Sequence, residues 1–294
     1  MRLLLFFFIA VLRVATVFGQ LNSDRPVQQY NLASDTLSYP KPKHFEYVTR
    51  LPNTFGEAGK LTWRKETLLP FALITASTLV ILPFDQDILE ATNRFSSFVH
   101  VDPERKYRTL IGFDLGDTEV KVYEAPQNFN SVLYTLGEGS TSMLISGGLY
   151  LYGKIGKDYR AGQTASDIVR AQIAVGLVTQ LLKRISGRQS PFVSTQDGGK
   201  WSPLTSPATY QKHVPNYDAF PSGHLASMMA TVTVLALHYP EKKWIKPVGY
   251  ALMTLVSTAM INNGVHWASD YPLALGIGYL FGKATVANYT LPRN

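Results

Sequence analysis

The 294-residue sequence contains no cysteine. This absence excludes a disulfide framework, a thiolate metal site and a cysteine nucleophile, although it leaves the cellular compartment open. There is no internal repeat, no low-complexity tract and no motif typical of nucleic-acid-binding proteins, so we expect no nucleic-acid partner. Charged residues are also few, at 17%, whereas 46% of the residues are hydrophobic, which is more apolar than an average soluble protein.

Acidic residues are fewer than basic ones, 21 against 28, which gives a formal net charge of +7. An excess of positive charge suits anionic partners such as phosphorylated small molecules or lipid head groups. The length provides one large domain or two small ones with enough material for a hydrophobic core. Composition leaves the oligomeric state unknown.

The N-terminus has the pattern of a secretory signal. Ten apolar residues, Leu3 to Leu12, follow the positive start Met1-Arg2, and Gly19 lies where a signal peptidase would cut. We therefore predict a signal peptide over residues 1–19. A membrane anchor is the alternative, but the run is short for a span and Arg13 interrupts it. We expect export to a bacterial cell envelope, either to the periplasm or into the membrane with the active site on the non-cytoplasmic side.

Two further parts follow the signal. Residues 20–65 are polar and contain four prolines, which predicts an extended arm with little core of its own. Residues 66–290 contain apolar runs and helical spacing, which predict an all-α bundle of about six helices. Alternation at Thr118–Tyr123 predicts a short strand or hairpin arm. The predicted helices cover residues 67–84, 142–152, 165–185, 225–237, 248–261 and 273–284.

A long loop rich in proline, serine and glycine separates two of these helices, between Arg188 and Asp218. Loops of this length inside a compact domain are usually functional, so we expect it on the active side of the bundle. The helix before it should stop at Gly187 in a left-handed cap. Only residues 67–84 reach spanning length cleanly, so the sequence leaves open whether the bundle is soluble or embedded in a membrane.

The stretch Pro221-Ser222-Gly223-His224 opens directly into an apolar helix. The first backbone N–H groups of a helix lack internal partners and lie at the positive end of its dipole, which favours an anion. His224 in the same turn could give a proton to a leaving oxygen. On its own, such a turn is more often a simple helix start.

A second histidine occurs near a helix start. His266 and Asp270 are four residues apart, close enough for the carboxylate to accept the proton of one ring nitrogen. The other ring nitrogen would then be free to act as a nucleophile or base. Pro272 predicts that a helix begins near Asp270, which places the pair at a helix mouth. A lone histidine is usually structural, but this spacing is poorly explained by packing alone.

A third cluster is basic: Lys183, Arg184 and Arg188 lie at the end of the predicted helix over residues 165–185. Basic residues at a helix C-terminus complement its dipole, so this cluster alone has a simple structural explanation. Its position just before the long loop makes it equally a candidate for binding an anion.

Together, in this order, the three segments resemble the type-2 phosphatidic acid phosphatase superfamily, which includes vanadium haloperoxidases and bacterial acid phosphatases. That family has the motifs Lys-x6-Arg-Pro, Pro-Ser-Gly-His and Ser-Arg-x5-His-x3-Asp. The resemblance covers about residues 165–284. It implies an all-α bundle, a metal-free mechanism without a cofactor, and a phosphorylated small molecule or lipid as substrate, with possible membrane association.

The resemblance also implies roles for individual residues. His266 would attack phosphorus and form a phosphohistidine, with Asp270 orienting it. His224 would protonate the leaving oxygen and then help to activate water. The phosphate oxygens would be held by the hydroxyl of Ser222, the backbone of Gly223 and the ammonium of Lys183.

The sequence departs from the family at both arginines. Seven residues after Lys183 stands Ser190, and six residues before His266 stands Met260. One arginine in such a site can be worth about 10³–10⁵ in rate, so losing two without replacement should leave little activity. Arg188 lies two residues before Ser190 and would point the same way along an extended strand, so we hypothesise that it binds the phosphate. Weaker candidates are Asn262, Asn263, Lys212 and His213.

Three functions follow from this pattern. We favour a phosphatase that hydrolyses phosphomonoesters or lipid-linked phosphates and diphosphates outside the cytoplasm. A non-catalytic phosphate- or lipid-binding protein that retains the fold is the second possibility. A vanadate-dependent haloperoxidase is the third, and the missing arginines count against it too.

Overall fold

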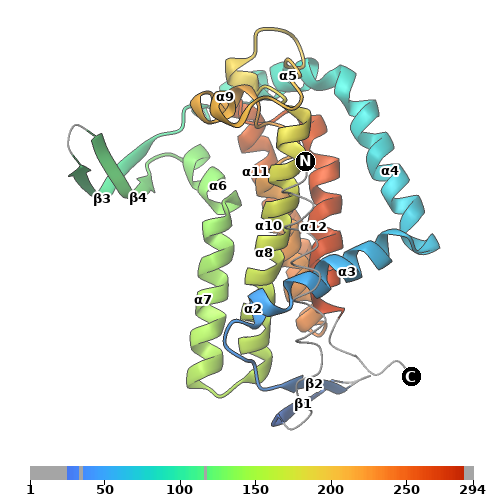
Figure 1. Ribbon diagram of the computed structural model, residues 1–294. Coiled ribbons are helices and arrows are strands. Elements are labelled where there is room, and N and C mark those ends of the chain that lie inside the picture. Colours follow the sequence, from blue (N-terminus) through green and yellow to red (C-terminus); the bar gives the residue numbers. More distant parts are fainter. Residues whose placement is uncertain (1–24, 33–35, 116–117, 288–294) are drawn as a thin grey trace.

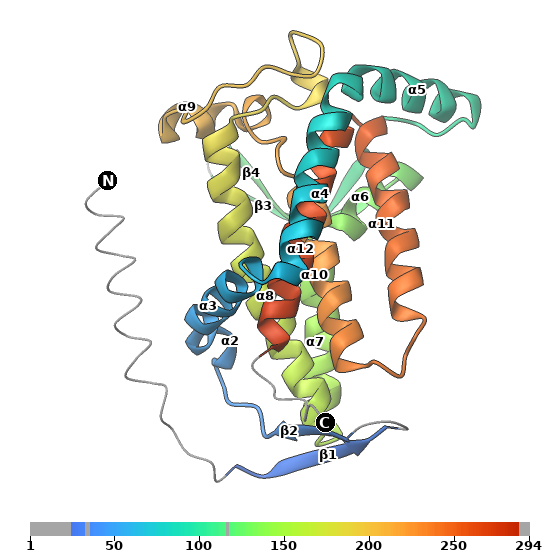
Figure 2. The ribbon, with the colours of Figure 1, turned by 90° about the vertical axis from the view of Figure 1, so that its right-hand side faces the viewer.

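The computed structural model describes residues 25–32, 36–115 and 118–287 (Figure 1). The predicted signal peptide lies outside the described residues. Within them, most of the chain is helical, and the long helices run side by side as a bundle (Figures 1 and 2). The bundle helices are α4 (Lys65–Ile81), α7 (Gly139–Ile155), α8 (Tyr159–Ser186), α10 (Gly223–His238), α11 (Ile245–Asn262) and α12 (Tyr271–Val286). The predicted all-α bundle is therefore confirmed.

Local sequence signals explain where these helices begin and end. The carboxylate of Asp158 accepts a hydrogen bond from the backbone N–H of Ala161 and caps the start of α8. Gly187 ends α8 at φ 57°, the left-handed conformation that the sequence predicts for a helix cap. Helix α12 begins at Tyr271 with Pro272 in its first turn, also as predicted.

Helices α10 and α12 form the tightest contact in the bundle, because two glycines on α12 allow their backbones to approach. A Cβ atom at Gly278 would lie 2.4 Å from the carbonyl oxygen of Ala226, and one at Gly282 would lie 2.8 Å from Cβ of Thr233. Small residues four apart permit such close helix packing. This contact fixes the start of α10 beside the turn that leads into α12.

The Gly278→Ala substitution should destabilise the fold. The added methyl group has no room beside Ala226, and overpacking of this kind costs about 1–3 kcal/mol. The matched control is Gly147→Ala on α7, where a Cβ would meet nothing within 4 Å. Because alanine is the better helix former, that control should unfold at the same or a higher temperature than the parent protein. Thermal unfolding in detergent checks this, and equal melting temperatures for both variants would contradict it.

The N-terminal segment is more ordered than the predicted polar arm. Strands β1 (Val27–Asn31) and β2 (Thr36–Pro40) form an antiparallel hairpin, followed by the short helix α2 (Glu46–Thr49) and by α3 (Leu51–Thr62). Helix α3 packs against α12 and buries Ala58 and Leu61 in the main core. The structure thus differs from the expectation of an arm with little core, because tertiary contact orders a segment with no sustained hydrophobic period.

A second hairpin extends sideways from the bundle (Figure 1). Helix α5 (Asp85–Phe98) precedes it, strands β3 (Tyr107–Leu115) and β4 (Thr118–Pro126) form it, and α6 (Phe129–Gly137) leads back into α7. The strand predicted from the alternation at Thr118–Tyr123 is therefore confirmed as part of β4. This excursion brings residues from the middle of the chain to the end of the bundle where α10 begins.

The long loop after α8 covers that same end of the bundle (Figure 2). It contains the short helix α9 (Pro207–Lys212) and 3₁₀ turns at Pro191–Val193 and Val214–Asn216. The backbone of Arg188 pairs with Trp201 and with Asp218, which ties the two ends of the loop together. The loop thus lies at the end of the bundle that carries the start of α10.

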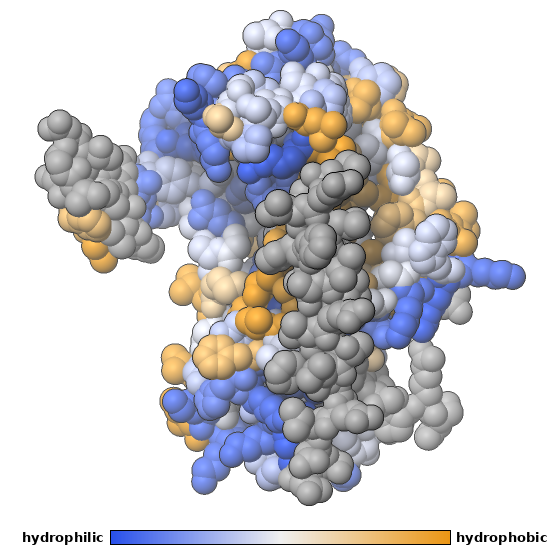
Figure 3. Space-filling model, in the orientation of Figure 1, coloured by the Kyte–Doolittle hydropathy of each residue, from blue (hydrophilic) through white to orange (hydrophobic). Residues whose placement is uncertain are grey.

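Helix α4 leaves most of its apolar side chains uncovered. The helical stretch Thr67–Phe98 is long and apolar enough to cross a membrane, although the 3₁₀ turn Leu82–Phe84 separates α4 from α5 within it. On α4, Leu69, Leu73 and Leu79 are each at least 60% exposed. Figure 3 shows hydrophobic surface along this flank and hydrophilic surface at the loop end. Exposed apolar area on this scale is typical of a surface that contacts lipid or another protein.

Candidate active site

The first turn of α10 is capped by the residue that precedes it. The hydroxyl of Ser222 accepts a hydrogen bond from the backbone N–H of Leu225 at 3.5 Å, which is the usual role of a helix-capping serine. The backbone N–H of Ser222 donates to the carbonyl oxygen of Asp270 at 3.1 Å. The hydroxyl of Ser222 thus caps the helix as an acceptor, and its own proton is still available for the predicted hydrogen bond to a phosphate oxygen.

Gly223 lies next to the predicted lysine. A Cβ atom at Gly223 would be 3.9 Å from Nζ of Lys183, so the ammonium lies close to the start of α10. Lys183 is buried in the last turn of α8. A cation and the positive end of a helix dipole therefore converge on one small region, which favours an anion there.

Both predicted imidazoles reach this region. The rings of His224 and His266 have their centroids 5.9 Å apart and meet edge to face at 75°. One comes from the first turn of α10 and the other from the turn before α12, two elements held together by the close glycine contact. The convergence that the sequence predicts is therefore present.

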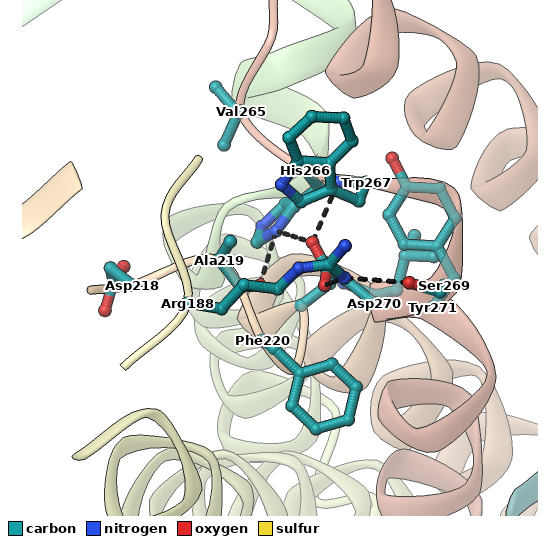
Figure 4. Close-up of polar contacts among 12 residues, drawn as sticks. Arg188, Asp218, Ala219, Phe220, Val265, His266, Trp267, Ser269, Asp270 and Tyr271 are labelled. Atoms are coloured by element: carbon teal, nitrogen blue, oxygen red, sulfur yellow. Dashed lines mark hydrogen bonds and ion pairs between the residues drawn. The ribbon is translucent and has the colours of Figure 1, made fainter. Parts of the chain in front are cut away.

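Hydrogen bonding fixes the orientation of His266 (Figure 4). Its Nδ1 lies 2.8 Å from the carbonyl oxygen of Ala219, and Oδ2 of Asp270 is further away at 3.4 Å. A carbonyl oxygen can only accept, so Nδ1 carries the proton and Nε2 keeps its lone pair. Asp270 thus shares the predicted orienting role with a backbone carbonyl that is the nearer partner.

Arg188 does not face the imidazoles as a free cation, which corrects the prediction that it binds phosphate. Its guanidinium is fully buried and donates to Asp270 at 2.6 Å, to Ser269 at 2.7 Å and to Asp85 at 2.6 Å. Its remaining N–H groups point to the carbonyl oxygen of Gly198. All five donors of the guanidinium are therefore used within the protein. The reason for the difference is the pair of buried carboxylates, which compete with any bound anion.

The buried network around Arg188 holds Asp270 in place. Asp85, at the start of α5, also accepts from the backbone N–H of Ser269 at 2.9 Å and from its hydroxyl. The other oxygen of Asp270 accepts from the backbone N–H of Trp267 at 2.8 Å. Three buried donors besides the guanidinium thus fix the two carboxylates, and through Asp270 they fix the turn that carries His266.

Lys183 has a carboxylate partner on the loop. Its Nζ lies 2.8 Å from Oδ2 of Asp218, and the other oxygen of Asp218 accepts from the hydroxyl of Tyr210. Burial, together with the neighbouring Asp218 carboxylate, raises the pKa of Tyr210, so the phenol stays protonated and donates. One N–H of the ammonium is occupied in this way, which leaves two for an anion.

Helix α6 forms another wall beside His224. The ring of Tyr134 lies 4.8 Å from the ring of His224, centroid to centroid. A Cβ at Gly137 would be 3.4 Å from Cδ2 of His224 and 3.0 Å from the methyl group of Met260. Met260, which replaces a family arginine, is thus a buried apolar residue beside the imidazole. No sequence motif marked α6 as part of the site.

The structure brings together most of the predicted residues. His224, His266, Asp270, Lys183 and Gly223 surround one region. Sequence reasoning assigned no role to Asp85, Asp218, Ser269 and Tyr134, of which Ser269 lies inside the third motif and the other three lie outside the motifs. Two of them carried a positional signal, because Asp218 lies three residues before Pro221 and Ser269 directly precedes Asp270.

Comparison with known proteins agrees with the resemblance. Residues 165–292 match the family model of the PAP2 superfamily. Over 67 residues, 22% of this chain, the sequence is 33% identical to lipid A 1-phosphatase of Porphyromonas gingivalis. The match spans only 15% of the length of that relative. A solved transmembrane PAP2-type phosphatidylglycerolphosphate phosphatase from Bacillus subtilis covers 85% of this chain and 100% of its own, with 14% identity and a TM-score of 0.33.

Proposed function

Because residues 165–292 belong to the PAP2 superfamily, we propose that this chain is a metal-independent phosphatase that hydrolyses lipid-linked phosphates or diphosphates through a phosphohistidine. The observation that carries this proposal is the convergence of two imidazoles, 5.9 Å apart, beside a buried lysine and the start of a helix. Such an arrangement supplies a nucleophile, a proton donor and positive charge around one phosphoryl group.

In the first step, Nε2 of His266 attacks phosphorus and forms a nitrogen–phosphorus bond. The bond between phosphorus and the leaving oxygen breaks, and His224 gives that oxygen a proton. Nδ1 of His266 keeps its proton on the carbonyl of Ala219, with Asp270 beside it, so the ring stays oriented as positive charge develops. Lys183 and the first N–H groups of α10 stabilise the charge on the equatorial oxygens.

In the second step, water replaces the imidazole. His224, now neutral, accepts a proton from a water molecule that attacks phosphorus on the side vacated by the leaving group. The nitrogen–phosphorus bond breaks, inorganic phosphate leaves, and both histidines return to their starting states. Tyr134 packs against His224 and holds its ring at the site throughout.

A lipid substrate is supported by the surface of the bundle. Large apolar side chains are exposed on α4, α7 and α8, among them Leu73, Leu144 and Leu181 at 60% or more. Burying so many apolar groups in hydrocarbon is favourable, because exposing their surface to water costs free energy. We therefore propose that the bundle lies in a membrane, with the loop end and its imidazoles at the level of the phosphorylated head groups and, as the sequence predicts, on the non-cytoplasmic side.

The test uses membranes from cells that produce the chain. After a carbonate wash and extraction in detergent, the purified protein should release inorganic phosphate from phosphatidic acid in mixed micelles, with EDTA present. Lys183→Met should lower kcat/KM by about 10²–10³, because the ammonium that stabilises the negative charge on the equatorial oxygens is lost. The control is Lys154→Met, at the last turn of α7 and the opposite end of the bundle.

Three outcomes would contradict the proposal. Release of the protein by carbonate would overturn the embedded bundle, and loss of turnover with EDTA would overturn the metal-independent mechanism. Binding of phosphate without any turnover would favour the non-catalytic alternative instead.

A further inference from the structure

Arg105 is an exposed arginine in the connection between α5 and β3, far from the motifs in sequence. Its guanidinium carbon lies 5.2 Å from the ring centre of Tyr134 and 5.6 Å from that of Phe192. Tyr134 in turn packs on His224. Among the residues that the structure describes, no carboxylate lies within ion-pair distance of this guanidinium. Arg105 is therefore a cation without a carboxylate partner, one aromatic ring away from the catalytic imidazole.

A pocket of about 380 Å³ lies beside Arg105. It is lined by the end of α11, by the turn at Pro191–Val193 and by α5. The pocket adjoins the turn that carries His266. Two of its lining residues are bonded there, since the backbone N–H of Phe192 donates to the carbonyl oxygen of Gly264 at 3.0 Å. One acidic residue, Glu104, lines the pocket, and Lys106 lies 3.4 Å from its carboxylate. The remaining lining is neutral or basic.

Two amide groups in this pocket lack partners. Nδ2 of Asn262 and Nδ2 of Asn263 are buried and make no hydrogen bond, and Asn262 is only 6% exposed. The amide of Asn263 is oriented by its oxygen, which accepts from the backbone N–H of Val265 at 3.3 Å. Buried donors without acceptors are costly unless a ligand satisfies them. Each NH₂ group and the nearby guanidinium would be satisfied by the same kind of ligand, an anion with several oxygen acceptors.

We propose that Arg105, Asn262 and Asn263 form an anion subsite that binds the substrate's phosphoryl oxygens and replaces the two arginines missing at residues 190 and 260. This inference rests on the proposed phosphatase function and adds a residue from outside the matched region. It also explains why Arg188 can be committed to Asp85 and Asp270. Arg105 thus supplies, from the far side of the Tyr134 ring, the positive charge that Ser190 and Met260 do not provide.

Arg105→Gln tests the subsite, with Arg108→Gln as the matched control. Arg108 is an exposed arginine three residues away on β3. We expect Arg105→Gln to lower kcat/KM by about 10²–10³, and the affinity for vanadate by more than tenfold, because vanadate mimics the transferring phosphoryl group. Arg108→Gln should stay within twofold of the parent protein. Added guanidinium ion should restore part of the rate to Arg105→Ala and none to His266→Asn.

The outcomes separate the subsite from the phosphatase proposal. If Arg105→Gln matches Arg108→Gln in turnover and in vanadate affinity, the subsite is wrong while the phosphatase function stands. If the parent protein has no turnover, equilibrium binding of phosphate still decides the subsite, since only Arg105→Gln should weaken it. Equal loss for both variants would also overturn the proposal, because it would indicate a general effect of net charge.

Discussion

His266→Asn should release phosphate on the order of 10³–10⁶ times more slowly than the parent protein, because the proposed nucleophile is lost. Asparagine is the informative replacement. Its side-chain amide can donate to the carbonyl of Ala219 as Nδ1 of the histidine does, yet it has no basic nitrogen to attack phosphorus. The fold should therefore survive while the chemistry stops. Steady-state phosphate release from phosphatidic acid measures the effect.

The covalent intermediate gives a second readout for the same residue. With a labelled substrate that has a good leaving group, His224→Asn should accumulate acid-labile phosphoenzyme, because the second step lacks its base. His266→Asn should form none. His44→Asn, at an exposed residue of the N-terminal segment, serves as the control and should behave as the parent protein does. Equal labelling of His266→Asn and the parent protein would rule out His266 as the nucleophile.

Arg188→Leu should cause a large loss of stability. The guanidinium is fully buried between Asp85 and Asp270, so its removal leaves two buried carboxylates without their main partner. Removing one member of a buried ion pair costs about 3–5 kcal/mol, which corresponds to a fall in melting temperature of about 6–20 °C for a domain of this class. The melting temperature of Arg188→Lys should lie between those of Arg188→Leu and the parent protein, because lysine keeps the positive charge but lacks the planar guanidinium. Thermal unfolding in detergent is the measurement.

Two further variants make this prediction specific. Arg94→Leu removes an exposed arginine of α5 and should change the melting temperature by no more than about 1–2 °C. The double variant Asp85→Leu with Arg188→Leu should recover part of the stability lost by Arg188→Leu, because one unpaired carboxylate is removed with the cation. A parent-like melting temperature for Arg188→Leu would show that the network is dispensable.

Much of the helical framework could be predicted from local sequence. Helix α8 was predicted from the helical spacing of its apolar residues and from Gly187, which adopts the expected left-handed cap. Helix α3 was not predicted, because its sequence includes proline and two glycines and has no sustained period. It is ordered by burying Ala58 and Leu61 against α12, a contact that no local pattern encodes.

In the site, too, some residues could be predicted from local sequence and others could not. The two histidines were predicted because each lies in a motif at a helix start, and the structure brings their rings together. The position of Arg188 was misjudged, because its partner Asp85 lies 103 residues away along the chain. Arg105 carried no signal at all. Partners that meet only through the fold decide whether a basic residue binds substrate or stabilises the protein.

The position of the N-terminal hairpin bears on which side of a membrane each end of the bundle would face. The hydroxyl of Tyr39 on β2 lies 3.1 Å from Nδ1 of His238, the last residue of α10. His224 lies in the first turn of the same helix, about 21 Å away along its axis. In an embedded bundle, the hairpin and the imidazoles would therefore lie toward opposite faces of the membrane. Imidazoles outside the cell require a hairpin that never crossed the bilayer, whereas a leader cut after residue 19 delivers the hairpin outward and turns the imidazoles toward the cytosol. The proposed outward-facing centre therefore predicts a hairpin on the cytoplasmic side, and locating the hairpin tests that prediction.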